Sequence, residues 1–242
     1  MTREYVRLEV RRTLRDPGFV IFSAGMPVLM YLLFTNLGAA DDGAAAWRTT
    51  AMVGMAAYGA LGAAVSVGTG ISEDRSLGWL RQLRVTPLRP RQVVLGRAVT
   101  SSVTVLPAIL TVLAAGAIVN GVRLDAWRWA LLVLLLWAGT LPFTLLGIGN
   151  GYRLSAQSAG VVNTGALMGM AVLGGLWFPI EAFPDWLRSV AAYTPAHGFA
   201  ELGWAATGAP ASALTALAVV LGWLAVFGSY AVMSYRTSAR TT

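Results

Sequence analysis

Residues 49–72 read TTAMVGMAAYGALGAAVSVGTGIS, and none of these 24 side chains carries a charge. An α-helix rises about 1.5 Å per residue, so roughly 20 residues cross a bilayer core about 30 Å thick. An uncharged run of this length is too long for the core of an ordinary soluble domain. The stretch therefore predicts a helix that spans a membrane.

Five more uncharged runs follow the same pattern, at residues 17–40, 98–122, 129–152, 154–180 and 202–235. Only 12% of the residues are charged, whereas soluble domains carry about 25%. We therefore predict an all-α integral membrane protein with a single transmembrane domain over residues 1–242. Six transmembrane helices are expected at about residues 18–38, 49–71, 98–120, 128–150, 155–178 and 211–234.

The distribution of arginine predicts the orientation of these helices. If both termini lie on one side of the membrane, fourteen of the eighteen basic residues lie on that side. Cytoplasmic loops carry the excess of arginine, so both termini are expected in the cytoplasm and the protein in the cell membrane. The net charge of +7 then reflects an inner surface that faces anionic lipid, and it does not indicate a nucleic-acid partner.

The first segment, residues 1–16, is predicted to be an amphipathic helix at the cytoplasmic interface. Arg7, Arg11 and Arg15 form one stripe of this helix, which Pro17 helps to end. Two roles remain open for it. It anchors the chain by its charge, or it also receives force from a partner protein.

An outer helical loop is expected at residues 179–207. Pro184 and Pro195 bracket a short helix whose apolar face includes Trp186 and Tyr193. Aromatic side chains of this kind settle at the level of the lipid headgroups, so this helix should lie in the outer interface.

Proline and glycine shape the predicted spans. Pro27, Pro107 and Pro142 fall inside helices, where each removes a backbone hydrogen bond and favours a kink. The second span is rich in small residues, and the fifth contains Gly165 and Gly169 at a spacing that lets helices approach closely. Both spans are therefore expected to pack tightly, and a pathway along them is the alternative use of their small residues.

Four residues of these two spans are candidates for a substrate pathway: Met55, Tyr58, Asn163 and Met168. They offer apolar and aromatic contact with few polar groups, which suits an amphipathic or planar compound. Asn163 is the most polar residue well inside a span, and a hydrogen bond between helices explains it adequately.

Several residue types are missing, and each absence excludes a class of chemistry. No Asp, Glu, Arg or His lies within a span, which disfavours ion-coupled transport. The chain has no cysteine, and its single histidine, His197, is interpreted as a structural hydrogen-bonder, so no metal site is expected.

Residues 147–151 are expected to form a turn at a span end rather than a dinucleotide-binding loop. Because no lysine is present, the chain cannot form a phosphate-binding P-loop, and any ATP must bind another chain.

The loop at residues 72–97 is the most charged part of the middle of the chain. We predict a helix from about Glu73 to Arg84, capped by Ser72 and stopped at Thr86-Pro87, followed by a second helix from Pro90. The apolar residues of the first helix, Trp79 and three leucines, fall within one half of its wheel. A solvated basic loop needs no such register, so an amphipathic helix that meets a cytoplasmic partner explains more of the sequence.

The same loop resembles the cytoplasmic coupling loop of type-2 ATP-binding-cassette (ABC) transporter permeases, the membrane subunits of bacterial drug and antibiotic-resistance exporters. The residues that match the family pattern are Glu73, Gly78, Thr86, Pro87, Leu88 and Gly96. Trp79 stands where the family has threonine, and Arg97 where it has lysine. The segment from Leu176 to Leu202, with its Pro-x-Trp-Leu and Thr-Pro, also resembles the family.

The resemblance implies a permease subunit of an ATP-driven exporter of a hydrophobic or amphipathic compound, such as a drug, an antibiotic or a lipid-like molecule. Two permease copies, as a homodimer or heterodimer, would bind two separate ATPase chains that hold the ATP and Mg²⁺. Spans two and five would face the dimer axis. The residues implied in ATPase contact are Glu73, Asp74, Arg75, Gly78, Arg81 and Arg84, with Thr86 and Pro87 shaping the turn.

Two other classes of protein remain open. One is a secondary carrier or channel that ATP does not drive. The other is a membrane scaffold or enzyme subunit without a catalytic site of its own.

Overall fold

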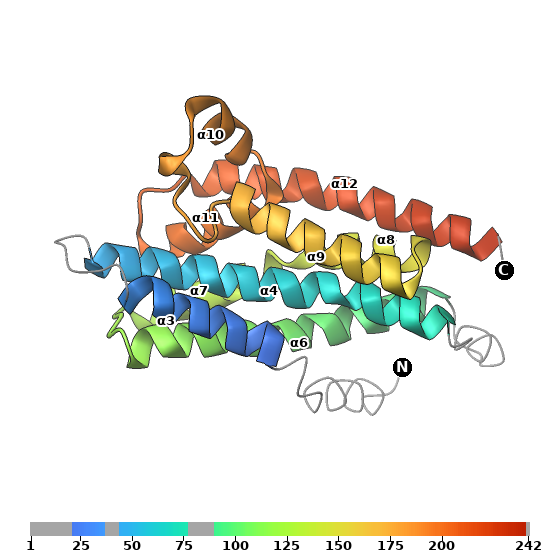
Figure 1. The fold of residues 1–242 in the computed structure, drawn as a ribbon, viewed down its shortest axis with the longest axis horizontal. Coiled ribbons are helices and arrows are strands. Elements are labelled where there is room, and N and C mark those ends of the chain that lie inside the picture. Colours follow the sequence, from blue (N-terminus) through green and yellow to red (C-terminus); the bar gives the residue numbers. More distant parts are fainter. Residues whose placement is uncertain (1–20, 37–43, 77–89, 241–242) are drawn as a thin grey trace.

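A computed structural model describes residues 21–36, 44–76 and 90–240, and these residues form helices and no strand. In chain order the elements are η1 (Ile21–Gly25), α3 (Met26–Asn36), α4 (Ala44–Ser76), α6 (Pro90–Ile118), α7 (Ala126–Ala138), α8 (Leu141–Arg153), α9 (Ala156–Leu173), η2 (Ile180–Ala182), α10 (Asp185–Ala191), α11 (Pro195–Thr207) and α12 (Ala213–Arg240). Most of the helices run along the long axis of one elongated bundle (Figure 1). The prediction of an all-α protein is confirmed.

Three helical stretches in the described residues are long and apolar enough to cross a membrane: Ala45–Ser76, Ala126–Arg153 and Ala213–Ser238. They coincide with the second, fourth and sixth predicted spans. The other three predicted spans also fall on helices, namely η1 with α3, then α6 and α9. The chain is therefore built as a multi-pass membrane protein.

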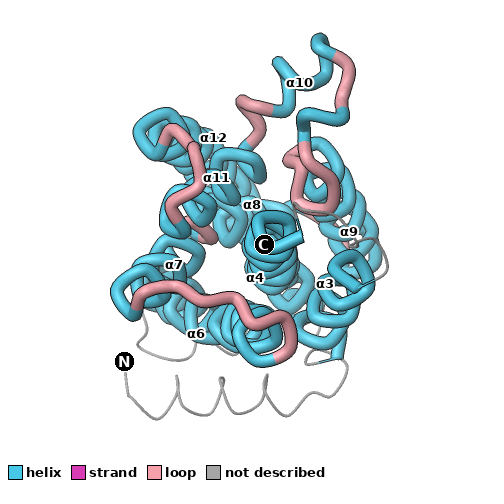
Figure 2. The backbone as a smooth tube through the Cα atoms, turned by 90° about the vertical axis from the view of Figure 1, so that its left-hand side faces the viewer, coloured by secondary structure: helices cyan, strands magenta, loops and turns pink. Residues whose placement is uncertain are grey.

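Helix α4 is the centre of the bundle. It contacts α3, α6, α8, α9 and α11, and the view along the bundle shows it surrounded by these helices (Figure 2). Most of its side chains are buried, including Met52, Met55 and Leu61, which have no exposed surface. A helix that is apolar on every face belongs in such a position, because each face then meets another helix.

The three prolines act differently on their helices. Pro27 follows the π-helical turn η1. Proline has no backbone N–H to donate, and the altered hydrogen-bond pattern of a π-helical turn accommodates this missing bond. Pro142 stands in the first turn of α8, just after the break at residues 139–140 that separates it from α7. Pro107 lies inside α6, which remains continuous.

Glycines bring α4 and α8 into backbone contact. A Cβ atom on Gly68 would collide with the carbonyl oxygen of Gly147, and one on Gly151 would lie 2.5 Å from Gly68 O. The expected turn at residues 147–151 is therefore wrong, because α8 stays helical to Arg153. These glycines serve close helix packing, the usual role of small residues in membrane helices.

The segment after α9 contains two helices of different character. The short helix expected between Pro184 and Pro195 is confirmed as α10, which projects from one end of the bundle with Trp186 exposed (Figure 1). Helix α11 instead packs among α4, α7, α9 and α12, and its Phe199 is fully buried. Thr194 caps its N-terminus by accepting the His197 N–H.

Candidate functional site

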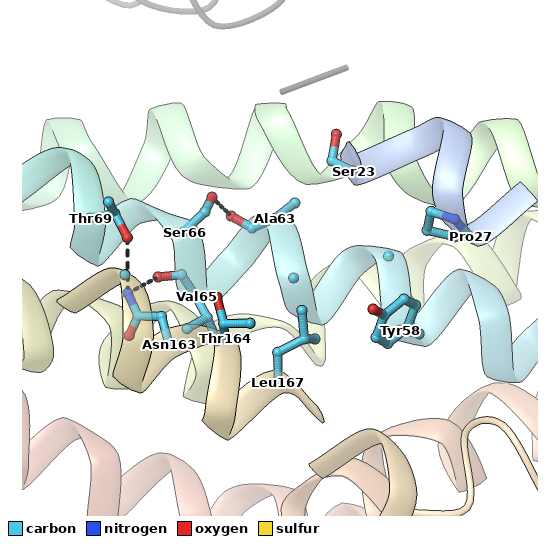
Figure 3. Close-up of a pocket in the computed structure, with 13 residues that line it drawn as sticks. Ser23, Pro27, Tyr58, Ala63, Val65, Ser66, Thr69, Asn163, Thr164 and Leu167 are labelled. Carbon is cyan, nitrogen blue, oxygen red and sulfur yellow. Dashed lines mark hydrogen bonds between the residues drawn. The ribbon is translucent and has the colours of Figure 1, made fainter. Parts of the chain in front are cut away.

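A cavity of about 360 Å³ lies beside α4, between that helix, α9 and the start of the first span (Figure 3). Most of its lining residues are small or weakly polar: Ser23, Pro27, Tyr58, Gly59, Gly62, Ala63, Val65, Ser66, Thr69, Gly160, Asn163, Thr164 and Leu167. We refer to it as the central cavity. Its size lies within the range of about 300–1,000 Å³ that is typical of sites for small molecules.

The sequence contains a signal for this cavity beyond the four predicted pathway residues. Gly59, Gly62, Ser66 and Thr69 follow one another at intervals of three or four residues along α4. Residues at this spacing share one face of a helix. The two glycines of this face leave room for a ligand, because they have no side chain. The hydroxyl groups of Ser66 and Thr69 supply hydrogen-bond partners.

The structure places the four predicted pathway residues in different surroundings. Tyr58 and Asn163 both line the central cavity (Figure 3). Met55 is fully buried in the core, and Met168 is 45% exposed on the outer side of α9; neither lines the cavity.

Asn163 belongs to a chain of hydrogen bonds that joins four helices. Its Oδ1 accepts from Asn150 Nδ2 of α8 at 2.8 Å, and its Nδ2 donates to Thr69 Oγ1 of α4 at 3.2 Å. The Tyr230 hydroxyl of α12 donates to Asn150 Oδ1 at 2.9 Å. Both asparagines are buried, so these bonds satisfy polar groups that have little access to water. The expectation that Asn163 bonds between helices is confirmed, whereas its partners Asn150 and Tyr230 were not foreseen.

A second cavity, of about 230 Å³, lies nearer the start of α4. We call it the aromatic cavity, because Trp47, Trp177, Phe178 and Trp204 line it together with His197 and Glu201. Tyr58 of the central cavity meets Trp177 of the aromatic cavity edge to face, with ring centroids 5.3 Å apart. This aromatic pair joins the walls of the two cavities.

His197 makes the structural hydrogen bond that the sequence analysis expected. Its Nδ1 lies 3.1 Å from Gly174 O, and its ring packs against Trp204 with centroids 5.7 Å apart. The bond joins α11 to the end of α9.

The far end of α4 carries three of the residues implied in ATPase contact. Ser72 does not begin a helix there, as was predicted, because α4 continues without interruption to Ser76. Glu73, Asp74 and Arg75 therefore lie in its last turn, and Glu73 is exposed. Gly78, Arg81, Arg84, Thr86 and Pro87 lie outside the described residues, as does most of the predicted helix from 73 to 84. The predicted second helix from Pro90 is present as the start of α6.

Arg75 ties this end of α4 to its neighbour. Its Nη1 donates to Gly151 O at 2.8 Å and lies 3.4 Å from Leu154 O, at the C-terminus of α8. A cation is favourable there because the last carbonyls of a helix carry partial negative charge. The two acidic residues of the last turn gain nothing from the dipole of their own helix, so capping does not explain them.

Helix α9 presents a face that has no partner within the described chain. Val161, Met168 and Val172 are exposed on this helix. A Cβ atom added to Gly165 or Gly169 would meet nothing within 4 Å. Glycines at this spacing, left open in one copy, are suited to close contact with another helix.

Two comparisons with known proteins bear on this arrangement. The sequence model of a family described as "ABC-2 type transporter" matches residues 3–203. The "Putative transport permease YvfS" of Bacillus subtilis (strain 168) is 29% identical over 198 residues, which are 81% of each chain. Proteins of this family are transport components of the membrane that work with an ATP-binding subunit. The chain belongs to the ABC-2 type transporter family and is a membrane permease subunit.

Proposed function

We propose that the chain is the membrane-spanning half of an ATP-driven exporter, with six spans and both termini in the cytoplasm. Its cargo is a hydrophobic or amphipathic compound such as a drug, an antibiotic or a lipid-like molecule. A separate ATPase subunit holds the ATP and Mg²⁺. One observation carries the proposal: α4 runs without a break from the central cavity at Tyr58 to Glu73 and Arg75 at its end.

A continuous helix supports mechanical coupling between these two places. The 33 residues of α4 correspond to a rod about 50 Å long at about 1.5 Å per residue. A displacement of the Glu73 end by an ATPase therefore moves the cavity wall as well. The hydrogen bonds of Arg75 to the end of α8 would move a second helix together with α4.

The central cavity is the part of the pathway that one copy contributes. Its wall combines Leu167 and the Tyr58 ring with the hydroxyl groups of Ser66 and Thr69. Such a surface binds compounds with a flat or apolar body and a few polar atoms.

The open glycine face of α9 supports a dimer. A second copy packed on Gly165 and Gly169 would cover exposed apolar side chains and place its own α9 beside the central cavity, which Asn163 and Thr164 line from the same helix. This arrangement agrees with a pathway between two permease copies.

Purification of the tagged protein from its native membranes under gentle conditions tests the proposal. We expect an ABC ATPase to copurify, and Glu73→Ala to reduce its recovery without lowering the amount of permease in the membrane. Asp185→Asn is the control, since this carboxylate is exposed on α10, and α10 lies toward the other end of the bundle from the last turn of α4 (Figure 1).

A secondary carrier would behave differently in the same experiments. Its purification would yield no ATPase, even after crosslinking. It would also transport its substrate in proteoliposomes that contain no ATP. Either result would replace the exporter by the carrier.

A further inference from the structure

The aromatic cavity contains a pair of hydrogen-bond acceptors that face each other without a donor between them. His197 Nδ1 lies 3.1 Å from the carbonyl oxygen of Gly174. A carbonyl oxygen only accepts, so Nδ1 carries the hydrogen and Nε2 of the neutral ring is an acceptor. Glu201 Oε2 lies 4.0 Å from that Nε2.

The second carboxylate oxygen of Glu201 is already engaged. Oε1 accepts the backbone N–H of Ser212 at 3.0 Å, which holds the carboxylate in place. None of the described residues gives Oε2 a hydrogen bond. A direct hydrogen bond between the two side chains would measure about 2.7–2.9 Å, and the observed gap of 4.0 Å is longer. The gap instead suits one donor atom that reaches both acceptors.

The walls around this pair are aromatic and held in position. Trp47 Nε1 donates to Phe34 O at 3.2 Å, and Trp204 Nε1 donates to Thr50 O at 3.1 Å. Two of the indole rings that line the cavity are thus anchored to helix backbones. Aromatic surface attracts cations, and the attraction grows where water is excluded. The Glu201 side chain is 18% exposed, so its charge acts in largely desolvated surroundings.

The geometry points to a binding site for a protonated amine, that is, a primary or secondary alkylammonium group with a short chain or ring. Its N–H groups donate to Glu201 Oε2 and His197 Nε2, and its carbon atoms pack against the indole rings. A metal ion fits less well, because one carboxylate and one imidazole are too few ligands for it. An anion would be repelled by Glu201. A cavity of about 230 Å³ accommodates a molecule the size of phenethylammonium.

The site does not depend on the proposed energy source, since binding at equilibrium requires no ATPase. The amine has two possible sources with the same chemistry: a free amine, or the headgroup of phosphatidylethanolamine. Both present an ammonium group with N–H donors, so the experiment has one arm for each.

The test is saturation-transfer NMR of phenethylammonium chloride with the full-length permease in phosphatidylcholine nanodiscs. We expect signal transfer to the amine, and binding of neutral 2-phenylethanol weaker by about tenfold or more, because a charge-assisted hydrogen bond is lost. This comparison needs no variant. Empty nanodiscs give the background from partition into lipid.

Glu201→Gln keeps the acceptor for Ser212 and removes the charge, so it should weaken amine binding by about tenfold. Asp185→Asn removes the charge of an exposed carboxylate on α10 and should leave amine binding unchanged.

Nanodiscs of phosphatidylethanolamine separate the two sources of the amine. Reduced binding of phenethylammonium in these discs identifies the lipid headgroup as the occupant, and unchanged binding identifies a free amine. The proposal is overturned if 2-phenylethanol binds as well as the amine, if Glu201→Gln binds like the wild type, or if empty discs give the same signal.

Discussion

Asn150 and Asn163 are hydrogen-bonded to each other inside the helix bundle, with Nδ2 of the first 2.8 Å from Oδ1 of the second. They lie on α8 and α9, and each also bonds a further helix through Tyr230 or Thr69. The pair therefore connects the wall of the central cavity to α12. Inside the bundle such bonds order the helices, because an amide that lost its partner would find little water to replace it.

Replacing either asparagine by alanine should destabilise the bundle by about 0.5–2 kcal/mol, the usual range for hydrogen bonds between membrane helices. Unfolding of the purified protein in detergent measures the loss. The double variant should lose less than the sum of the single variants, because the second substitution removes a group that already lacks its partner. Strict additivity would show that the two residues act independently. Ser229→Ala is the control, since Ser229 is exposed and bonds only within its own helix.

Gly68→Ala should be among the most damaging small substitutions in the chain. The new methyl group collides with the backbone of Gly147, which cannot move aside like a flexible side chain. We expect a loss of about 1–3 kcal/mol in the free energy of unfolding. Gly222→Ala is the matched control, because its methyl group meets nothing within 4 Å. Equal stability of the two variants would contradict the close contact of α4 and α8.

Gly165→Leu should weaken association of two permease copies without unfolding the single copy. The side chain enters open space in one copy but blocks close helix approach in the proposed dimer. Gly222→Leu on α12 is again open in one copy and should leave the dimer intact. Mass photometry in nanodiscs, or crosslinking in membranes, measures the dimer fraction. If both variants dimerise like the wild type, the interface lies elsewhere.

Thr164→Phe should block export by placing an aromatic ring in the central cavity, which Thr164 lines from α9. Val226→Phe adds a ring at an exposed position of α12, outside both the cavity lining and the open face of α9, so its effect should be small. Uptake of a fluorescent amphipathic dye into inside-out vesicles compares the two. If Thr164→Phe exports like the wild type, the pathway does not pass through the central cavity.

Arg75→Ala should destabilise the protein by about 1–3 kcal/mol, because it removes charged hydrogen bonds to the end of α8. Arg75→Lys keeps the charge but replaces the guanidinium by a shorter side chain with a compact ammonium group, so its stability should lie between those of Arg75→Ala and the wild type. Arg236→Ala, at an exposed position on α12, is the control. Unfolding in detergent separates this structural role from that of Glu73, whose substitution should affect ATPase recovery and leave stability unchanged.

Hydropathy and the positions of proline predicted most of the secondary structure. The uncharged runs predicted helices at the right places, the kink expected at Pro142 coincides with the break between α7 and α8, and Pro184 with Pro195 predicted α10. These features are local, because the length of an apolar run and the missing N–H of proline act within a few residues. The same local reasoning failed at residues 147–151, where glycines that look like a turn are held in a helix by the packing of α4.

The functional surfaces depend on contacts between distant parts of the chain. Asn163 and Thr69 are 94 residues apart, and Arg75 and Gly151 are 76 residues apart. Nothing in the local pattern of either partner indicates which helix it will face. The sequence by itself determined an all-helical membrane protein and the position of its helices, since burying apolar length requires no knowledge of neighbours. Only the tertiary structure decided which faces enclose the two cavities, because that depends on side-chain volumes and backbone contacts where several helices meet.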